Sequence, residues 1–165
     1  MRDTEIERPV VEASIMFYSN QTLSIEKDPL SLAIPTNSYV LVVDDDNAIL
    51  SVVMLLLGTE GYSNLGISNS QKVLPFLEQI QVVKARFPSV ILLDLMMPVI
   101  SGYEIAAELS KHEWSAHIPI VIMTADHRMT NINMVPGATD WMSKPFRIEV
   151  LLNKLERHMP PALIG

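Results

Sequence analysis

The stretch YVLVVDDDNAIL, residues 39–50, passes from five apolar residues directly into three aspartates. An apolar run without polar alternation is typical of a strand that is buried on both faces of a parallel sheet. Asp46 has an ordinary explanation, because it precedes the apolar-periodic run 47–57 and fits the N-cap of a helix. Asp44 and Asp45 need a different one, since adjacent carboxylates repel by roughly 4 kcal/mol per pair at ~4 Å near a protein surface.

Further apolar runs alternate with helix-like segments along the rest of the chain. We expect strands at 90–94 and 118–124, and weaker strands at 62–67 and 139–143. Helical patterning is found at 47–59, 70–85, 102–110 and 148–158, with a poor stretch near 128–135. Alternating strands and helices with right-handed crossovers predict an α/β fold in three layers, built on a doubly wound, five-stranded parallel sheet.

Composition limits the class of protein. The chain has 165 residues, of which 48% are hydrophobic, enough for one domain with a substantial core. Its net charge of −7, without a basic run, argues against direct binding of nucleic acid or an anionic membrane. The sequence has no cysteine, no secretory-type N-terminus and no apolar run of ~18 residues. We therefore expect a cytoplasmic protein that does not insert into membranes.

The domain pattern does not extend to the N-terminus. Residues 1–38 hold scattered apolar groups broken by three prolines, and we expect a flexible or partly helical extension. A docking or dimerisation arm is the alternative, so a dimer is possible. Residues 39–160 form the predicted domain, and residues 161–165 form a short tail.

Several polar side chains follow the predicted strands. The carboxyl ends of parallel strands meet at one edge of a sheet, which brings Asp94 to the same edge as Asp44 and Asp45. Carboxylates that are this close raise one another's pKa unless a cation binds. Oxygen ligands without nearby His or Cys suit Mg²⁺ best.

Thr124 and Lys144 belong to the same edge, because each follows or ends a later strand. A divalent cation, a lysine and a hydroxyl around a carboxylate can stabilise the charge on a phosphoryl group. The attacking group would be a carboxylate, which would give an aspartyl phosphate.

Taken together, these motifs resemble the receiver domain of two-component response regulators over about residues 39–158. VLVVDDD resembles the acidic pair of that family, carried by Asp44 and Asp45, and LLDLMMPVISGYE resembles the phosphoacceptor loop around Asp94. VIMTA resembles the segment with the switch hydroxyl, at Thr124, and GATDWMSKPF the segment with the site lysine, at Lys144.

The resemblance implies a flavodoxin-like strand order, 2-1-3-4-5, and a set of residue roles. Asp45 and Asp94 would hold Mg²⁺ with the backbone carbonyl of Met96, while Asp44 acts mainly through bound water. Thr124 and Trp141 would form the switch, and the bond before Pro145 would be cis. For Trp141, plain half-buried packing is the alternative.

The resemblance also implies partners. The phosphoryl donor would be a histidine kinase or a phosphotransfer protein, and a downstream protein would read the switched surface. Such a domain is a signalling phosphoacceptor, which catalyses only its own phosphorylation and dephosphorylation.

Two segments depart from the family pattern. ADHRMTNINMVP, residues 125–136, is short and rich in poor helix formers, so we expect the fourth helix to be short or distorted. The segment 68–88 is longer than usual, which allows an extended second helix.

Three other functions remain as alternatives. A flavin or nucleotide binder would need a Gly-, Ser- or Thr-rich loop where this chain has DDDN. An aspartyl phosphatase would need a general acid two residues after Asp94, where Met96 stands. A pseudo-receiver would keep the fold and signal without phosphate, and the unusual fourth helix favours it.

Overall fold

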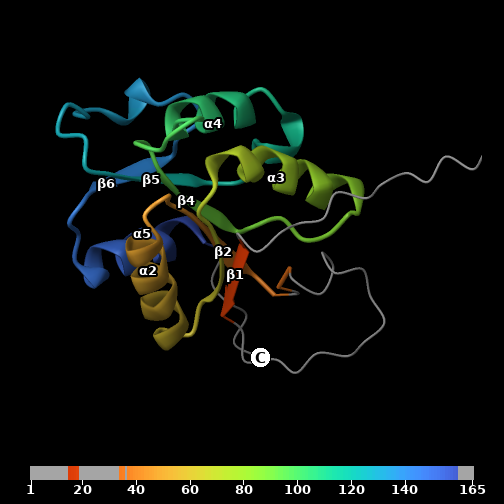
Figure 1. The fold of residues 1–165 in the computed structure, drawn as a ribbon, viewed down its shortest axis with the longest axis horizontal. Helices are drawn as coiled ribbons and strands as arrows, with labels where there is room; N and C mark the ends of the chain where they lie inside the picture. Colours follow the sequence, from red (N-terminus) through yellow and green to blue (C-terminus); the bar gives the residue numbers. More distant parts are fainter. Residues whose placement is uncertain (1–14, 19–33, 36, 160–165) are drawn as a thin grey trace, which may run out of the picture.

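A single mixed sheet forms the centre of the molecule (Figure 1). The structure, a computed structural model, describes residues 15–18, 34–35 and 37–159. Within these residues six strands lie in the order β1-β3-β2-β4-β5-β6. Their bounds are β1 Ile15–Tyr18, β2 Tyr39–Val43, β3 Ser63–Ile67, β4 Val90–Asp94, β5 Ile120–Thr124 and β6 Asp140–Ser143.

The parallel part of the sheet confirms the predicted topology. Strands β2 to β6 are parallel, and their order β3-β2-β4-β5-β6 is the predicted 2-1-3-4-5. All residues of β2, β4 and β5 are buried, as expected for apolar strands covered on both faces. The pairs Val43–Leu93 and Asp94–Met123 bring the carboxyl ends of these strands to one edge.

Strand β1 differs from the expectation for residues 1–38. It runs antiparallel to β3, with Ile15 opposite Ile67 and Tyr18 opposite Asn64. The sequence IMFY combines β-branched and aromatic residues, and β3 would otherwise present a free edge of N–H and C=O groups. The remaining residues before Ile34 lie outside the described part of the chain, as does the tail 161–165.

Helices cover both faces of the sheet. In Figure 1, α2 and α5 lie on one face and α3 and α4 on the other. Each pair has its own core, with Met54 and Leu155 in the first and Leu77 and Ile105 in the second. The α-helices are α2 Asn47–Thr59, α3 Val73–Val82, α4 Gly102–Leu109 and α5 Ile148–His158, and the 3₁₀ turns are η1 Ser70–Lys72, η2 Glu113–Ser115 and η3 Ile132–Met134.

Two segments test the expectations about helix length, namely the connection from β5 to β6 and the segment that contains α3. Between β5 and β6 the described chain forms only the 3₁₀ turn η3, which confirms the expected short, distorted element. The longer second helix is not formed, because α3 ends at Val82 and Lys84 takes a left-handed φ of 53°. Residues 83–89 form the connection from α3 to β4 without a further helix. The bond between Lys144 and Pro145 is cis, as predicted.

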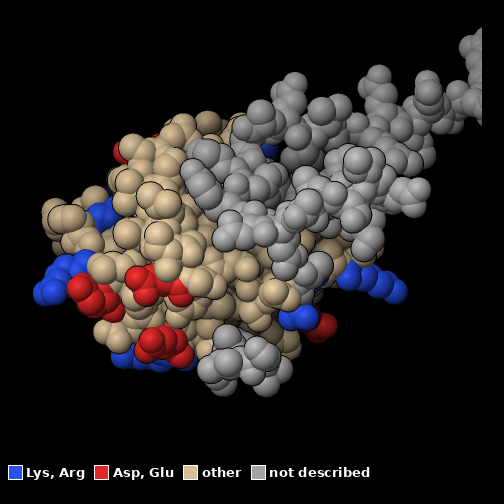
Figure 2. Space-filling view, turned by 90° about the horizontal axis from the view of Figure 1, so that it is seen from below, with Lys and Arg blue, Asp and Glu red and all other residues tan. Residues whose placement is uncertain are grey.

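Helix α2 has an uncharged outer surface. It carries no Lys, Arg, Asp or Glu, and Val52 and Leu55 are 56% and 55% exposed. Figure 2 views the molecule from the side on which α2 and α5 lie, and most of the described surface that it shows is uncharged, with acidic side chains gathered on its lower left part. Among the described residues, no helix has the length and apolar character needed to cross a membrane.

Candidate functional site

Three carboxylates meet where β2 and β4 end. Asp94 is the last residue of β4, and Asp44 follows β2 directly. Both are buried, with 0% exposure for Asp44 and 5% for Asp94, whereas Asp45 is accessible to solvent. One carboxylate oxygen of each lies within 4.8 Å of the others. This all-oxygen donor set, with one member open to solvent, fits Mg²⁺, which keeps several of its waters.

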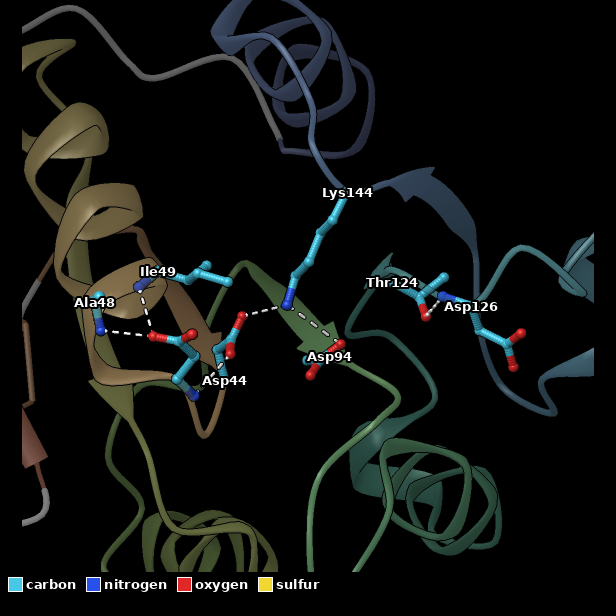
Figure 3. A network of polar contacts seen from close by, with 8 residues as sticks. Asp44, Ala48, Ile49, Asp94, Thr124, Asp126 and Lys144 are labelled. Atoms are coloured by element: carbon cyan, nitrogen blue, oxygen red, sulfur yellow. Dashed lines mark hydrogen bonds and ion pairs between the residues drawn. The ribbon is translucent and has the colours of Figure 1, made fainter.

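Lys144 enters this group from the loop after β6. Its Nζ lies 2.6 Å from Asp44 Oδ2 and 3.3 Å from Asp94 Oδ1, so the ammonium bridges the two buried carboxylates (Figure 3). The Lys144 backbone N–H donates to the Thr124 carbonyl at 2.7 Å, which fixes the lysine to the end of β5. The lysine side chain is 13% exposed, so water screens these contacts little.

Burial dominates the electrostatics of Asp44. Desolvation raises the pKa of Asp44, and the hydrogen bond and charge of Lys144 oppose that rise without cancelling it. The Asp46 N–H also donates to Asp44 Oδ1 at 3.0 Å. The cluster holds three carboxylates, and the Lys144 ammonium pairs with two of them, so the pocket retains excess negative charge that a divalent cation would offset.

The loop after Asp94 is held close to the strand that precedes it. A Cβ on Gly102 would lie 2.0 Å from the Asp94 carbonyl oxygen, so only glycine fits at this position. The buried Ser70 Oγ donates to the Pro98 carbonyl at 2.8 Å and anchors the loop from η1. Val99 in the same loop has a φ of 68°, which is rare for a β-branched residue.

The Thr124 hydroxyl is near the acidic group but bonded elsewhere. Thr124 is 1% exposed, and its Oγ1 accepts a hydrogen bond from the Asp126 N–H at 3.0 Å. In Figure 3 this bond lies on the side of Thr124 away from Asp94. Trp141 is half-buried and packs on the core beneath α3 and α4.

Met96 lies beside the site with an exposed side chain. It is 55% exposed and helps to line a surface hollow together with Ala125, Asp126, His127 and Arg128. The role predicted for its backbone carbonyl as a metal ligand stays a prediction.

The structure brings most of the predicted site residues together. Asp44, Asp45, Asp94 and Lys144 form one group, with Thr124 at its side. Sequence reasoning did not predict that Lys144 would contact Asp44 more closely than Asp94.

Two further residues lie at the site without a prediction from the sequence. Ser70 falls in the predicted helical segment 70–85, which does not indicate its contact with the Pro98 carbonyl, and Arg128 falls in the poor stretch 128–135. A D-x-R pattern at 126–128 was the available signal for Arg128, because an Asp side chain readily bonds the backbone two residues later.

A parallel α/β sheet with buried aspartates, a lysine and a hydroxyl at its carboxyl edge defines a receiver-type signalling domain. Residues 40–156 match the family model described as the response regulator receiver domain. The chain therefore belongs to this family, whose members act in two-component signal transduction.

Known relatives and solved structures agree with this membership. The phosphate regulon transcriptional regulatory protein PhoB of Pseudomonas aeruginosa is 33% identical over 121 residues, covering 71% of this chain and 49% of PhoB. The chemotaxis protein CheY4 of Vibrio cholerae has a TM-score of 0.61 and 32% identity, covering 74% of this chain and 99% of that one. The response regulator TrrA of Thermotoga maritima, solved with Mg²⁺ and BeF, has a TM-score of 0.63 and 26% identity, covering 74% and 99%.

The chain spans about half the length of the curated relatives that it matches. The resemblance to those relatives therefore concerns their receiver part.

Proposed function

We propose that this chain is a phosphoacceptor, with Asp94 receiving a phosphoryl group. The observation that carries the proposal is the Lys144 ammonium, which lies 2.6 Å from Asp44 and 3.3 Å from Asp94 in a largely buried pocket. A phosphoryl group on Asp94 would place new negative charge within reach of this cation. Lys144 would then form a charge-assisted hydrogen bond with it.

Mg²⁺ would be held by Asp45 and Asp94, with the Met96 carbonyl as a further ligand and Asp44 acting through water. When bound, the ion supplies positive charge that offsets the repulsion between the attacking carboxylate and the incoming phosphoryl oxygens. Supporting this assignment are the three convergent carboxylates and the solvent access of Asp45.

The donor would be a phosphohistidine on a histidine kinase or a phosphotransfer protein. A carboxylate oxygen of Asp94 forms the new bond to phosphorus while the bond from the imidazole nitrogen to phosphorus breaks, and the electron pair stays on the imidazole. Lys144 stabilises the equatorial oxygens during this transfer.

The signal would leave the site through Thr124 and Trp141. Thr124 would move to donate its hydroxyl hydrogen to the phosphoryl group, and the half-buried Trp141 would repack into the space released. We propose a downstream protein partner in the cytoplasm, because the chain carries a net charge of −7 and no basic run that would suit nucleic acid.

Intact mass after incubation with acetyl phosphate tests the acceptor. The wild type should gain one phosphoryl group in the presence of Mg²⁺ and none after chelation of the metal. Asp94→Asn should gain none while its circular dichroism stays that of the wild type, because the carboxylate nucleophile is gone and the fold is not. Labelling of Asp94→Asn at the same position would contradict the proposal.

Asp46→Asn is the matched control. It also removes a carboxylate from the 44–46 run, but Asn caps helices as well as Asp does, so labelling should be unchanged. A folded wild type that gains no phosphoryl group would favour the pseudo-receiver, which signals without phosphorylation.

A further inference from the structure

The turn after β5 holds the Thr124 hydroxyl through a short chain of hydrogen bonds. The Asp126 N–H donates to Thr124 Oγ1 at 3.0 Å, and the Met129 N–H donates to the Asp126 carbonyl at 3.2 Å. Met129 is 3% exposed and anchors the far end of the turn in the core. The Asp126 amide is therefore fixed between a buried residue and the switch hydroxyl.

Arg128 donates hydrogen bonds to both oxygens of the Asp126 carboxylate. Oδ1 accepts from the Arg128 backbone N–H at 3.0 Å and from Nε at 2.8 Å, while Oδ2 accepts from the second guanidinium nitrogen at 2.8 Å. The Asp126 side chain is 6% exposed, although that of Arg128 is 80% exposed. A bidentate contact of this kind fixes the orientation of a carboxylate more firmly than a single contact does.

These contacts connect an exposed arginine to the switch. Arg128 holds the Asp126 side chain, which in turn fixes the turn whose amide bonds Thr124. A hydroxyl that accepts this amide hydrogen bond is drawn toward Asp126 and away from Asp94, as Figure 3 shows. Movement of Thr124 toward a phosphoryl group on Asp94 would have to weaken the bond.

We propose that Arg128 is a positioning residue: through Asp126 it holds the Thr124 hydroxyl in its resting position and so opposes the switch to the phosphorylated state. The proposal rests on the phosphoacceptor function proposed above. On this proposal, Arg128 sets the balance between the resting state and the phosphorylated state, and it does not touch the reacting atoms.

Binding of beryllium fluoride with Mg²⁺ measures that balance, because this pair is a phosphoryl mimic and is present in the TrrA structure. An exposed ion pair is a weak interaction, so its loss should shift this balance only modestly. We therefore expect Arg128→Ala to bind beryllium fluoride roughly two- to fivefold more tightly than the wild type does in calorimetry. Arg147→Ala is the matched control, since Arg147 is 83% exposed and has its own ion pair with Glu149 at 3.3 Å. Its affinity should equal that of the wild type.

A double-mutant cycle shows whether Arg128 acts through Asp126. In an Asp126→Ala background, Arg128→Ala should add nothing to the affinity. An equal gain with and without Asp126, or no gain in the single variant, would overturn the proposal.

The NMR resonance of the Asp126 amide reports directly on its hydrogen bond to Thr124 Oγ1, and this measurement needs no phosphoryl mimic. In Arg128→Ala without ligand, the Asp126 amide proton should shift upfield as its bond to Thr124 weakens, and Arg147→Ala should leave it unchanged. An unchanged Asp126 amide resonance in Arg128→Ala would refute the claim that Arg128 positions Thr124 through Asp126. If the wild type binds no beryllium fluoride, the phosphoacceptor function fails, and this resonance alone decides whether Arg128 positions Thr124.

Discussion

The three consecutive aspartates have three different environments. Asp46 caps α2, accepting hydrogen bonds from the Ala48 and Ile49 amides at 2.9 and 3.2 Å. Asp44 is buried against Lys144, and Asp45 reaches solvent beside it. Sequence alone predicted the cap and the acidic pair, because both follow from position relative to a strand and a helix. The depth of burial that separates Asp44 from Asp45 depends on neighbours that only the folded chain supplies.

Replacing Asp44 by Asn should stabilise the fold at neutral pH. Burial raises the pKa of Asp44, so the ionised carboxylate opposes folding once the pH rises above that pKa. Asn still offers an oxygen to the Asp46 amide, and Lys144 keeps Asp94 as a partner. We expect the free energy of unfolding at pH 7, in the absence of divalent cations, to rise by about 1 kcal/mol.

The pH dependence supplies the check on Asp44. A raised pKa gives stability that is fully present below the unfolded pKa and is lost as the pH rises through the folded value. The advantage of Asp44→Asn in urea unfolding should therefore shrink as the pH falls toward 4. An advantage that is constant across this range would assign the effect to packing.

Val99 carries backbone strain without compensating burial. Its φ is 68°, and its side chain is 76% exposed. A residue in a sparsely populated backbone region costs of order 1–3 kcal/mol. Val99→Gly should therefore raise the free energy of unfolding by about 1 kcal/mol in guanidinium titrations. Val52→Gly, at a comparably exposed position within α2, should lower it, because glycine disfavours a helix.

At the scale of elements, helices and strands with a long apolar or periodic sequence pattern could be predicted, and those with a short pattern could not. The apolar runs of β2 and β4 and the periodic segments of α2 and α5 gave bounds that the structure reproduces. Strand β1 was missed, because a segment of four residues has too little pattern to distinguish it from coil and pairs only once β3 exists. The early end of α3 was missed for a similar reason, since nothing between residues 83 and 85 marks a helix stop.

Helix α5 is tied to β6 by one carboxylate. Asp140 accepts from Lys154 Nζ at 2.6 Å and contacts His158 Nε2 at 3.0 Å, and it also accepts from the Trp141 N–H at 2.8 Å. Burial alone would raise the pKa of Asp140, but these partners outweigh it and lower the pKa to about 2. The same carboxylate therefore joins the end of the last helix to the backbone of Trp141.

Asp140→Asn should weaken the fold in a pH-dependent way. A lowered pKa gives stability that is present above the unfolded value and lost as the pH falls through the folded one. At pH 7 the variant should lose about 2 kcal/mol of unfolding free energy, and its deficit should narrow between pH 4 and pH 2 in denaturant titrations. Glu149→Gln removes an exposed ion pair, and its free energy of unfolding should stay within about 0.5 kcal/mol of the wild-type value at both pH 7 and pH 2. A deficit that persists at pH 2 would show that charge is not its cause.

At the scale of the whole molecule, topology assembles the site. Asp44 and Lys144 are 100 positions apart in sequence, yet parallel strands bring both to one edge of the sheet. That edge could be predicted from the order of strands alone. The resting partners of Lys144 and Thr124 could not, since they depend on which of several nearby acceptors and donors each side chain selects after packing.

Strand β1 bears on how the whole molecule behaves in solution. It pairs with β3 from Ile15 to Tyr18 and covers an edge that the parallel sheet would otherwise leave open. A shortened chain that begins at Ile34 keeps all five parallel strands, and it also keeps Ile34 itself, which is buried in the core. Its circular dichroism should therefore still show an α/β fold.

That shortened chain would expose the unpaired N–H and C=O groups of β3, and such edges template pairing with a second molecule. Sedimentation velocity at increasing concentration should therefore show stronger self-association for the chain that begins at Ile34 than for the full chain. The opposite result, with stronger association of the full chain, would indicate that the N-terminal extension joins two copies and does not shield one.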